Sequence, residues 1–240
     1  MHRKLLSMMI LTTFLLSGCL YPENRLAKNQ TPNQLQLDTV QKAVDQFVEQ
    51  HPMELPIKTR EQDVPIFRKY PVNFERLKET GIMSELPGNS YERGGVYQYV
   101  IITPEEDPTV KVIDLRTIQD VRDVNMRLIA YRNEHKYPPF KEEVAEDIYS
   151  INYELIGLDE PPTVVSPYSG NRLPILMDVD GNLYIDYRQD LYNALQEYDH
   201  NYVNGDDIRF LLADHSAIVP AYSLPYTVKD GEPVFYQKGS

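Results

Sequence analysis

The sequence contains no tryptophan and only one cysteine, Cys19, among its 240 residues. A single cysteine cannot form a disulfide within the chain, so packing alone has to hold the fold together. Basic residues are also scarce, with 24 Lys and Arg against 36 Asp and Glu. Because nucleic-acid binding depends on clustered Lys and Arg, this balance excludes a nucleic acid as the expected partner.

Long apolar runs and catalytic motifs are scarce as well. The only long apolar run, residues 5–16, has about a dozen residues, whereas a membrane-spanning helix needs roughly 20. The sequence has no Gly-x-Ser-x-Gly elbow, no phosphate-binding loop and no dinucleotide fingerprint. It therefore indicates no catalytic residue, no metal and no cofactor.

The first 18 residues are arranged like a secretory signal. Arg3 and Lys4 form a basic start, the apolar run follows, and small residues stand where a peptidase must approach the backbone. We expect residues 1–18 to direct export and then to be removed. Without the cysteine that follows, the segment would read as an ordinary secretory signal.

Leu16, Ser17, Gly18 and Cys19 supply an apolar residue, two small residues and a thiol in order. The arrangement resembles the bacterial lipobox, in which the thiol is acylated before cleavage on its amino side. The resemblance implies that residues 16–18 are recognised by the signal peptidase and that Cys19 is lipidated. A diacylglyceryl group holds a protein to a membrane without a transmembrane helix. We therefore expect the chain on the extracytoplasmic face of the cell membrane, which it contacts through its lipid anchor.

The mature chain has 222 residues and a net charge of about −14, because Arg3 and Lys4 leave with the signal. This charge disfavours a body that lies flat on anionic lipid. A polar leader over residues 20–30 follows the cysteine. A lipobox with such a leader resembles the uncharacterised lipoproteins of Gram-positive, spore-forming bacteria, which implies a location and names no activity.

The rest of the chain is predicted to be α+β, with two to three repeated helix-helix-β-hairpin units packed on a shared core and antiparallel strands. The predicted boundaries are residues 19–33 for the lipidated cysteine and polar tether, 34–116 for repeat unit 1, 117–188 for repeat unit 2, and 189–240 for a shorter unit 3.

Periodicity and turn residues predict the individual elements. The expected helices are residues 31–50 (with Thr31-Pro32 at its start), 75–80, 117–135 (with a Thr117/Asp120 capping box), 190–198 and 206–212. The expected strands are residues 96–102, 110–115, 175–177 and 183–186, with turns at Asp180-Gly181 and Asp230-Gly231.

Several polar groupings invite a functional interpretation. Asp114 with Arg116, and Asp186 with Arg188, lie two apart where a predicted strand meets a helix. Such spacing places both side chains on one face, and favours salt bridges or helix caps over a ligand site. Asp178, Asp180 and Asp186 could suggest calcium, but the spacing departs from that of an EF-hand and favours a hairpin turn.

Histidines and acids form a second group of candidates. His51 and His135 close two predicted helices, where capping is favoured over a shared metal site. His200 and His215 lack the spacing of a zinc motif. Glu142, Glu143, Glu146 and Asp147 are expected to form the solvated face of a short helix, although a pair of carboxylates could in principle act as acid and base.

The leading hypothesis is a lipid-anchored extracytoplasmic protein that acts as a binding or interaction module, with an envelope protein as partner. The first alternative is a solute-binding lipoprotein that serves a transporter. The second is a hydrolase of envelope polymers, which would require convergent carboxylates or a metal.

Overall fold

The structure, a computed structural model, describes residues 34–236, in which helices alternate with antiparallel strands. The helices are α2 (Gln34–Gln50), α3 (Ile66–Lys69), α4 (Phe74–Glu79), α5 (Leu115–His135), α6 (Arg188–Glu197) and α7 (Arg209–Asp214), with 3-10 turns at Tyr91–Arg93 and Tyr153–Ile156. The strands are β1 (Tyr97–Ile102), β2 (Thr109–Asp114), β3 (Phe140–Ala145), β4 (Ile148–Ile151), β5 (Thr163–Val165), β6 (Arg172–Asp178), β7 (Leu183–Ile185), β8 (Tyr226–Lys229) and β9 (Glu232–Phe235). The coarse prediction of a mixed fold with antiparallel strands is confirmed.

The strands form three groups, each antiparallel. β1 and β2 make one hairpin, and β8 and β9 make another. The third group is a five-stranded sheet in which β6 is the central strand and pairs with β4, β5 and β7. The predicted turns at Asp180-Gly181 and Asp230-Gly231 connect β6 to β7 and β8 to β9, and Gly181 and Gly231 both have positive φ, as those turns require.

The β1–β2 hairpin is buried on both faces. Successive strand residues point to opposite sides, so Tyr97, Tyr99 and Ile101 face a core shared with α2 and α4. Val100 and Ile102 face a second cluster that includes residues of α3, α5 and α7. The hairpin therefore joins the N-terminal helices to the rest of the chain.

Backbone pairing also extends both edges of this hairpin. The amide of Val72 donates to the carbonyl of Tyr99 at 3.0 Å on the β1 side. On the β2 side, the amide of Val112 donates to the carbonyl of Ala217 at 2.9 Å, and the amide of Val219 donates to the carbonyl of Val112 at 3.0 Å. Segments far apart in the sequence thus complete one small sheet.

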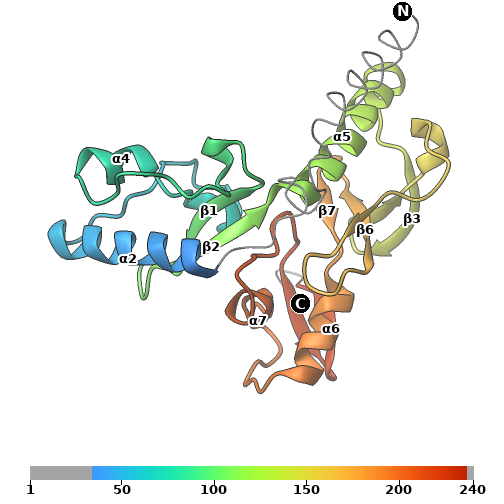
Figure 1. Cartoon of the computed structure of the whole chain (residues 1–240). Helices are drawn as coiled ribbons and strands as arrows, with labels where there is room; N and C mark the ends of the chain where they lie inside the picture. Colours follow the sequence, from blue (N-terminus) through green and yellow to red (C-terminus); the bar gives the residue numbers. More distant parts are fainter. Residues whose placement is uncertain (1–33, 237–240) are drawn as a thin grey trace, which may run out of the picture.

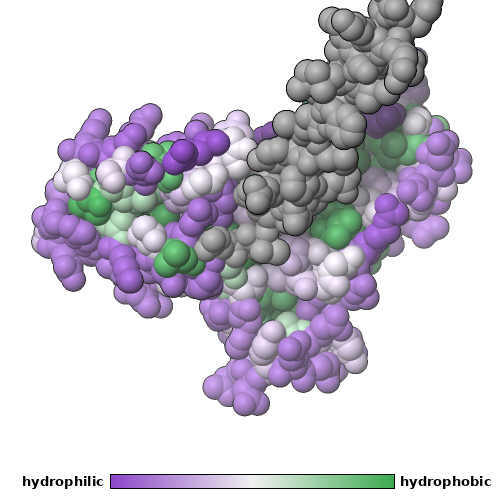
Figure 2. Space-filling model, viewed as in Figure 1, coloured by the Kyte–Doolittle hydropathy of each residue, from purple (hydrophilic) through white to green (hydrophobic). Residues whose placement is uncertain are grey.

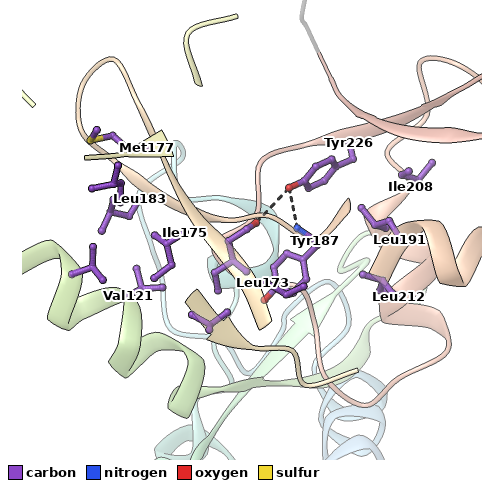
Figure 3. Packing of buried hydrophobic residues seen from close by; sticks show 14 of the residues in the cluster. Val121, Leu173, Ile175, Met177, Leu183, Tyr187, Leu191, Ile208, Leu212 and Tyr226 are labelled. Atoms are coloured by element: carbon purple, nitrogen blue, oxygen red, sulfur yellow. Dashed lines mark hydrogen bonds between the residues drawn. The ribbon is translucent and has the colours of Figure 1, made fainter. Parts of the chain in front are cut away.

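The main core lies between α5, the five-stranded sheet, α6, α7 and β8. Figure 3 shows part of it, with the Tyr226 ring lying beside β7 and the start of α6. The Tyr226 hydroxyl accepts from the amide of Tyr187 at 3.2 Å and lies 3.4 Å from the carbonyl oxygen of Ile185. One fully buried tyrosine therefore satisfies backbone groups at the junction of β7 and α6.

In Figure 1 the N-terminal helices α2 and α4 flank the β1–β2 hairpin on one side, and the sheet with β3 and β6 lies on the other. Helix α5 leads from the hairpin along the sheet, while α6 and α7 lie together below it. The face shown in Figure 2 is mostly hydrophilic, and its apolar residues form separate small patches. Across residues 34–236, no helix has the length and apolar character that crossing a membrane requires.

Two local predictions need correction. Residues 140–145 form strand β3 where a short helix was expected, and Glu146 and Asp147 lie in the turn that follows. Helix α5 starts at Leu115, because the Asp114 carboxylate caps it, so Thr117 and Asp120 do not form the predicted capping box. The Thr117 hydroxyl instead donates to the carbonyl of Asp114 at 2.7 Å.

The predicted repeats are not shown by the described part of the chain. Its first half contains a two-stranded hairpin, whereas the second half builds a five-stranded sheet. The fold is therefore mixed, with helices and antiparallel strands, and this topology does not show repeated helix-helix-hairpin units.

Candidate functional site

The two predicted Asp-x-Arg pairs have the same geometry, and a third pair shares it. Asp114 accepts from the backbone amide of Arg116 at 3.0 Å and from its Nε at 2.8 Å. Asp186 with Arg188, and Asp207 with Arg209, repeat both contacts, and Nη2 lies 2.5 Å from Oδ2 in all three pairs. Each pair stands at the first turn of α5, α6 or α7. We refer to these pairs as the three Asp-x-Arg clamps.

The prediction that the first two pairs cap helices and form salt bridges is confirmed. The carboxylate satisfies a backbone N–H that the helix itself leaves unpaired, and the guanidinium holds the carboxylate in a bidentate contact. The third pair was missed because its helix was predicted to start at residue 206. Its Asp-Ile-Arg pattern, so close to Asp-Leu-Arg at 114–116, was the available signal.

Burial distinguishes the third clamp from the other two. In the first, the Asp114 side chain is 4% exposed and that of Arg116 is 35% exposed, and the second clamp is similar. In the third, the Arg209 side chain is 7% exposed while that of Asp207 is 30% exposed. Arg209 also donates to the carbonyl and hydroxyl oxygens of Ser223. The buried charge is therefore the acid in two clamps and the base in the third.

Asp178 and Asp180, two of the aspartates considered for calcium, stand at the hairpin turn between β6 and β7, as predicted. The Asp178 carboxylate accepts from the amides of Asp180 and Asn182, from the Asn182 side chain and from the Tyr184 hydroxyl. These donors occupy the oxygens that a cation would need, and Asp186 is held by Arg188. Burial, together with the Asp178 carboxylate, raises the pKa of Tyr184 to about 12, so this hydroxyl stays a neutral donor at pH 7.

The histidines and the acidic run do not converge. His51 follows directly after α2 and stacks on Phe47 with ring centroids 4.4 Å apart, and its Nδ1 lies 3.1 Å from the Phe47 carbonyl oxygen. His135 is the last residue of α5 and packs on Tyr131. The four acids at residues 142, 143, 146 and 147 are exposed. Among residues 34–236, no three His, Cys, Asp or Glu side chains gather in a way that could hold a metal ion.

A buried carboxylate on α6 fastens the loop that joins β5 to β6. Asp190 is 2% exposed and accepts from the hydroxyls of Ser166 at 2.7 Å and Ser169 at 2.6 Å. Burial raises the pKa of Asp190, and the two serine donors oppose that rise. The Ser166 hydroxyl oxygen also accepts from the amides of Tyr168 and Ser169. This network ties the loop at residues 166–170 to α6 and gives Asp190 a structural role.

A cleft of about 560 Å³ opens where the N-terminal part meets the sheet. It is lined by four separate segments: residues 63–68 around α3, residues 121–125 of α5, the β6–β7 turn, and residues 222–223. Val121 and Leu183 line it from the main core (Figure 3), and both are less than 8% exposed. We call this the Arg68 cleft, after its least satisfied side chain.

Arg68 stands out among the polar residues of this cleft. Its Cζ lies 4.1 Å from the centroid of the Tyr222 ring, a cation–π contact. Its Nε is buried and has no hydrogen-bond partner. No acidic side chain among residues 34–236 lies within salt-bridge distance of Arg68 or of Arg122, the other arginine of the cleft. Sequence reasoning missed the cleft because its residues are far apart in the chain.

The predicted lipobox, Leu16, Ser17, Gly18 and Cys19, lies outside the described residues, as do the predicted signal, the tether and the expected helix start at Thr31-Pro32. The structure begins at Gln34, on the first turn of α2. Lipidation therefore stays a prediction from the sequence.

Comparison with known proteins gives one result. Residues 33–114 match the family model described as the YphF family N-terminal domain. The matched range contains α2, α3, α4 and the β1–β2 hairpin, and it ends at the aspartate of the first Asp-x-Arg clamp. No curated protein and no solved structure matches the chain. The match covers about a third of the sequence and leaves the sheet, α6 and α7 without a comparison.

Proposed function

We propose that the protein is a lipid-anchored, extracytoplasmic binding module that meets its ligand or partner in the cell envelope. The order Leu16-Ser17-Gly18-Cys19 after a basic and apolar leader supports anchoring through Cys19. In this proposal two lipid chains on that thiol hold the protein firmly, since one chain alone binds a membrane only marginally.

The Arg68 cleft carries the binding part of the proposal. Ligand sites in proteins form preferentially in concave regions where separate parts of the chain meet, with a few polar groups above an apolar lining. The Arg68 cleft lies where separate parts of the chain meet, because the N-terminal part supplies Arg68, α5 supplies Arg122 and Val121, and β7 supplies Leu183, and most of its lining residues are polar.

Metabolic labelling with a fatty acid tests the anchor. We expect label in the wild-type protein and none in Cys19→Ala, which should remain unprocessed or be released. Ser17→Ala keeps a small residue at the neighbouring position and is the matched control, because it should still be labelled. Label that persists in Cys19→Ala contradicts the anchoring proposal.

A solute-binding lipoprotein of a transporter is the second candidate, and the Arg68 cleft is the observation that favours it. Cross-linking in membranes separates the two roles. Capture of transporter subunits together with solute binding supports the second candidate, whereas capture of an envelope protein with no effect of solutes supports the first.

We also infer an internal repetition that is less regular than equal units. The three Asp-x-Arg clamps each begin a helix, and the first two follow the second strand of a β-hairpin. Duplication of a strand-clamp-helix segment accounts for this common geometry. Superposing the backbone of residues 109–121 on 181–193 tests the inference, and unrelated backbone paths on either side of the clamps would contradict it.

A further inference from the structure

We propose that the Arg68 cleft binds a small oxyanion, the carboxylate or phosphate group of a solute, with Arg68 and Arg122 as its charged contacts. This inference rests on the proposed binding function and names the chemical class of the ligand. Neither the three Asp-x-Arg clamps nor the hydrophobic core accounts for two arginines in this cleft, and oxyanion binding gives them a role.

The first observation is the state of Arg68. A guanidinium stacked flat on an aromatic ring keeps its N–H donors in the plane, directed away from the ring, in the fork that matches a carboxylate or phosphate. The Cζ atom of Arg68 lies 4.1 Å from the centroid of the Tyr222 ring, close enough for such a contact, and its Nε has no hydrogen-bond partner. Arg68 lines the cleft and makes no ion pair with an acidic side chain of residues 34–236, so its guanidinium has donors that no carboxylate of the described residues uses.

The second observation is the backbone that presents the ring. Tyr222 has φ of +59°, in the left-handed region that residues other than glycine rarely adopt. Its carbonyl accepts from the amide of Ile185 at 2.8 Å, and its neighbour Ser223 is 5% exposed and bound by Arg209. Strained conformations of this kind persist where surrounding contacts impose them, and they gather at binding sites.

The third observation is the local charge. The described chain is strongly acidic overall, yet the Arg68 cleft is lined by two arginines and one acid, the exposed Asp63. Asn125 adds a neutral amide donor, whereas the Asn182 side chain already donates to Asp178. The volume of about 560 Å³ falls in the usual range for small-molecule sites. An oxyanion therefore meets complementary charge and donors here.

Calorimetric titration of the purified full-length protein with sodium phosphate, and separately with sodium succinate, tests the proposal at constant ionic strength. We expect saturable binding of at least one anion, and the tighter of the two identifies phosphate or carboxylate as the preferred group. Arg68→Gln should weaken that binding at least tenfold, and Arg122→Gln should weaken it by a smaller factor.

Three further variants separate a specific site from general charge. Arg60→Gln removes the same charge from an exposed arginine outside the Arg68 cleft, and should leave binding unchanged. Arg68→Lys keeps the charge but loses the planar fork, so its binding should still fall. Tyr222→Leu removes the ring on which Arg68 lies and should weaken binding, with circular dichroism verifying the fold of each variant.

The proposal is overturned if neither anion binds saturably, or if Arg60→Gln weakens binding as much as Arg68→Gln does. Unchanged binding in folded Arg68→Gln or Arg68→Lys overturns it as well. These outcomes leave the labelling of Cys19 untouched, and loss of labelling leaves anion binding in solution untouched. The experiments can therefore refute oxyanion binding without refuting the lipid anchor, and the reverse.

Discussion

Asp207→Ala is the substitution whose cost follows most directly from the burial of the Asp-x-Arg clamps. Removing this carboxylate takes away the acceptor of the Arg209 backbone amide and the charge partner of a guanidinium that is 7% exposed. In the first clamp the equivalent change, Asp114→Ala, leaves behind Arg116, which is 35% exposed. The same chemical change should therefore have unequal effects.

Loss of a helix cap costs about 1 kcal/mol. Leaving a buried charge without its partner costs about 3–5 kcal/mol. Arg209 keeps two contacts with Ser223 and lies 5.2 Å from the Phe67 ring centroid, so we take the lower part of that range for it. The expected loss in the free energy of unfolding is about 4 kcal/mol for Asp207→Ala and about 1–2 kcal/mol for Asp114→Ala.

Replacing the arginines should reverse the order. Arg209→Met removes the buried charge itself and is expected to cost about 1 kcal/mol, whereas Arg116→Met strands the buried Asp114 carboxylate and should cost about 3 kcal/mol. Urea unfolding followed by far-UV circular dichroism measures all four. Asp199→Ala, at an exposed position, is the control and should stay within about 0.5 kcal/mol of wild type. Equal costs for Asp207→Ala and Asp114→Ala would refute the reasoning from burial.

Three other changes give sharp expectations. Because burial raises the pKa of Asp190, the native state keeps a proton on this carboxyl at pH values where the unfolded chain has lost it, so its contribution to stability should fall as pH rises from about 4 to the raised pKa. Over that pH range the urea midpoint of the wild type should drop relative to that of Asp190→Asn. Parallel curves of midpoint against pH would contradict this assignment. Tyr226→Phe should cost about 1–3 kcal/mol, measured by the same unfolding assay, because it leaves a buried backbone amide without its acceptor; a neutral effect would mean that water replaces the hydroxyl. Gly95→Ala should destabilise the protein by more than about 2 kcal/mol, since the new Cβ would lie 2.1 Å from the carbonyl oxygen of Asn89. Gly94→Ala is the comparison, because no atom lies within 4 Å of its Cβ and the substitution adds only the strain of a positive φ. Gly95→Ala should have the lower thermal midpoint of the two.

The elements that sequence reasoning located well are those with strong local signals. The apolar stripe of α2, the β-branched run of β1 and the Asp-Gly turns depend on neighbouring residues only. Residues 140–145 were misassigned because their acids read as a helix surface. The pairing of β3 with β4 decides that segment, and pairing is a tertiary property that composition does not carry.

The candidate sites divide in the same way. The clamps at Asp114 and Asp186 were visible because both partners lie two residues apart. The Arg68 cleft was not, because Arg68 meets Tyr222 from 154 positions away along the chain. Only the packing of α3 against the later segments brings the guanidinium and the ring together.

The edge of β2 has a consequence for the order in which the molecule can form. Residues 33–114 include every element of the matched N-terminal domain, yet the open side of β2 is closed by Ala217 and Val219, more than 100 residues later. While the chain is still being made, that edge has no partner and is open to pairing with another chain. A protein cut before residue 217 should therefore aggregate through β2, and the native hairpin is completed only when nearly all of the polypeptide has emerged.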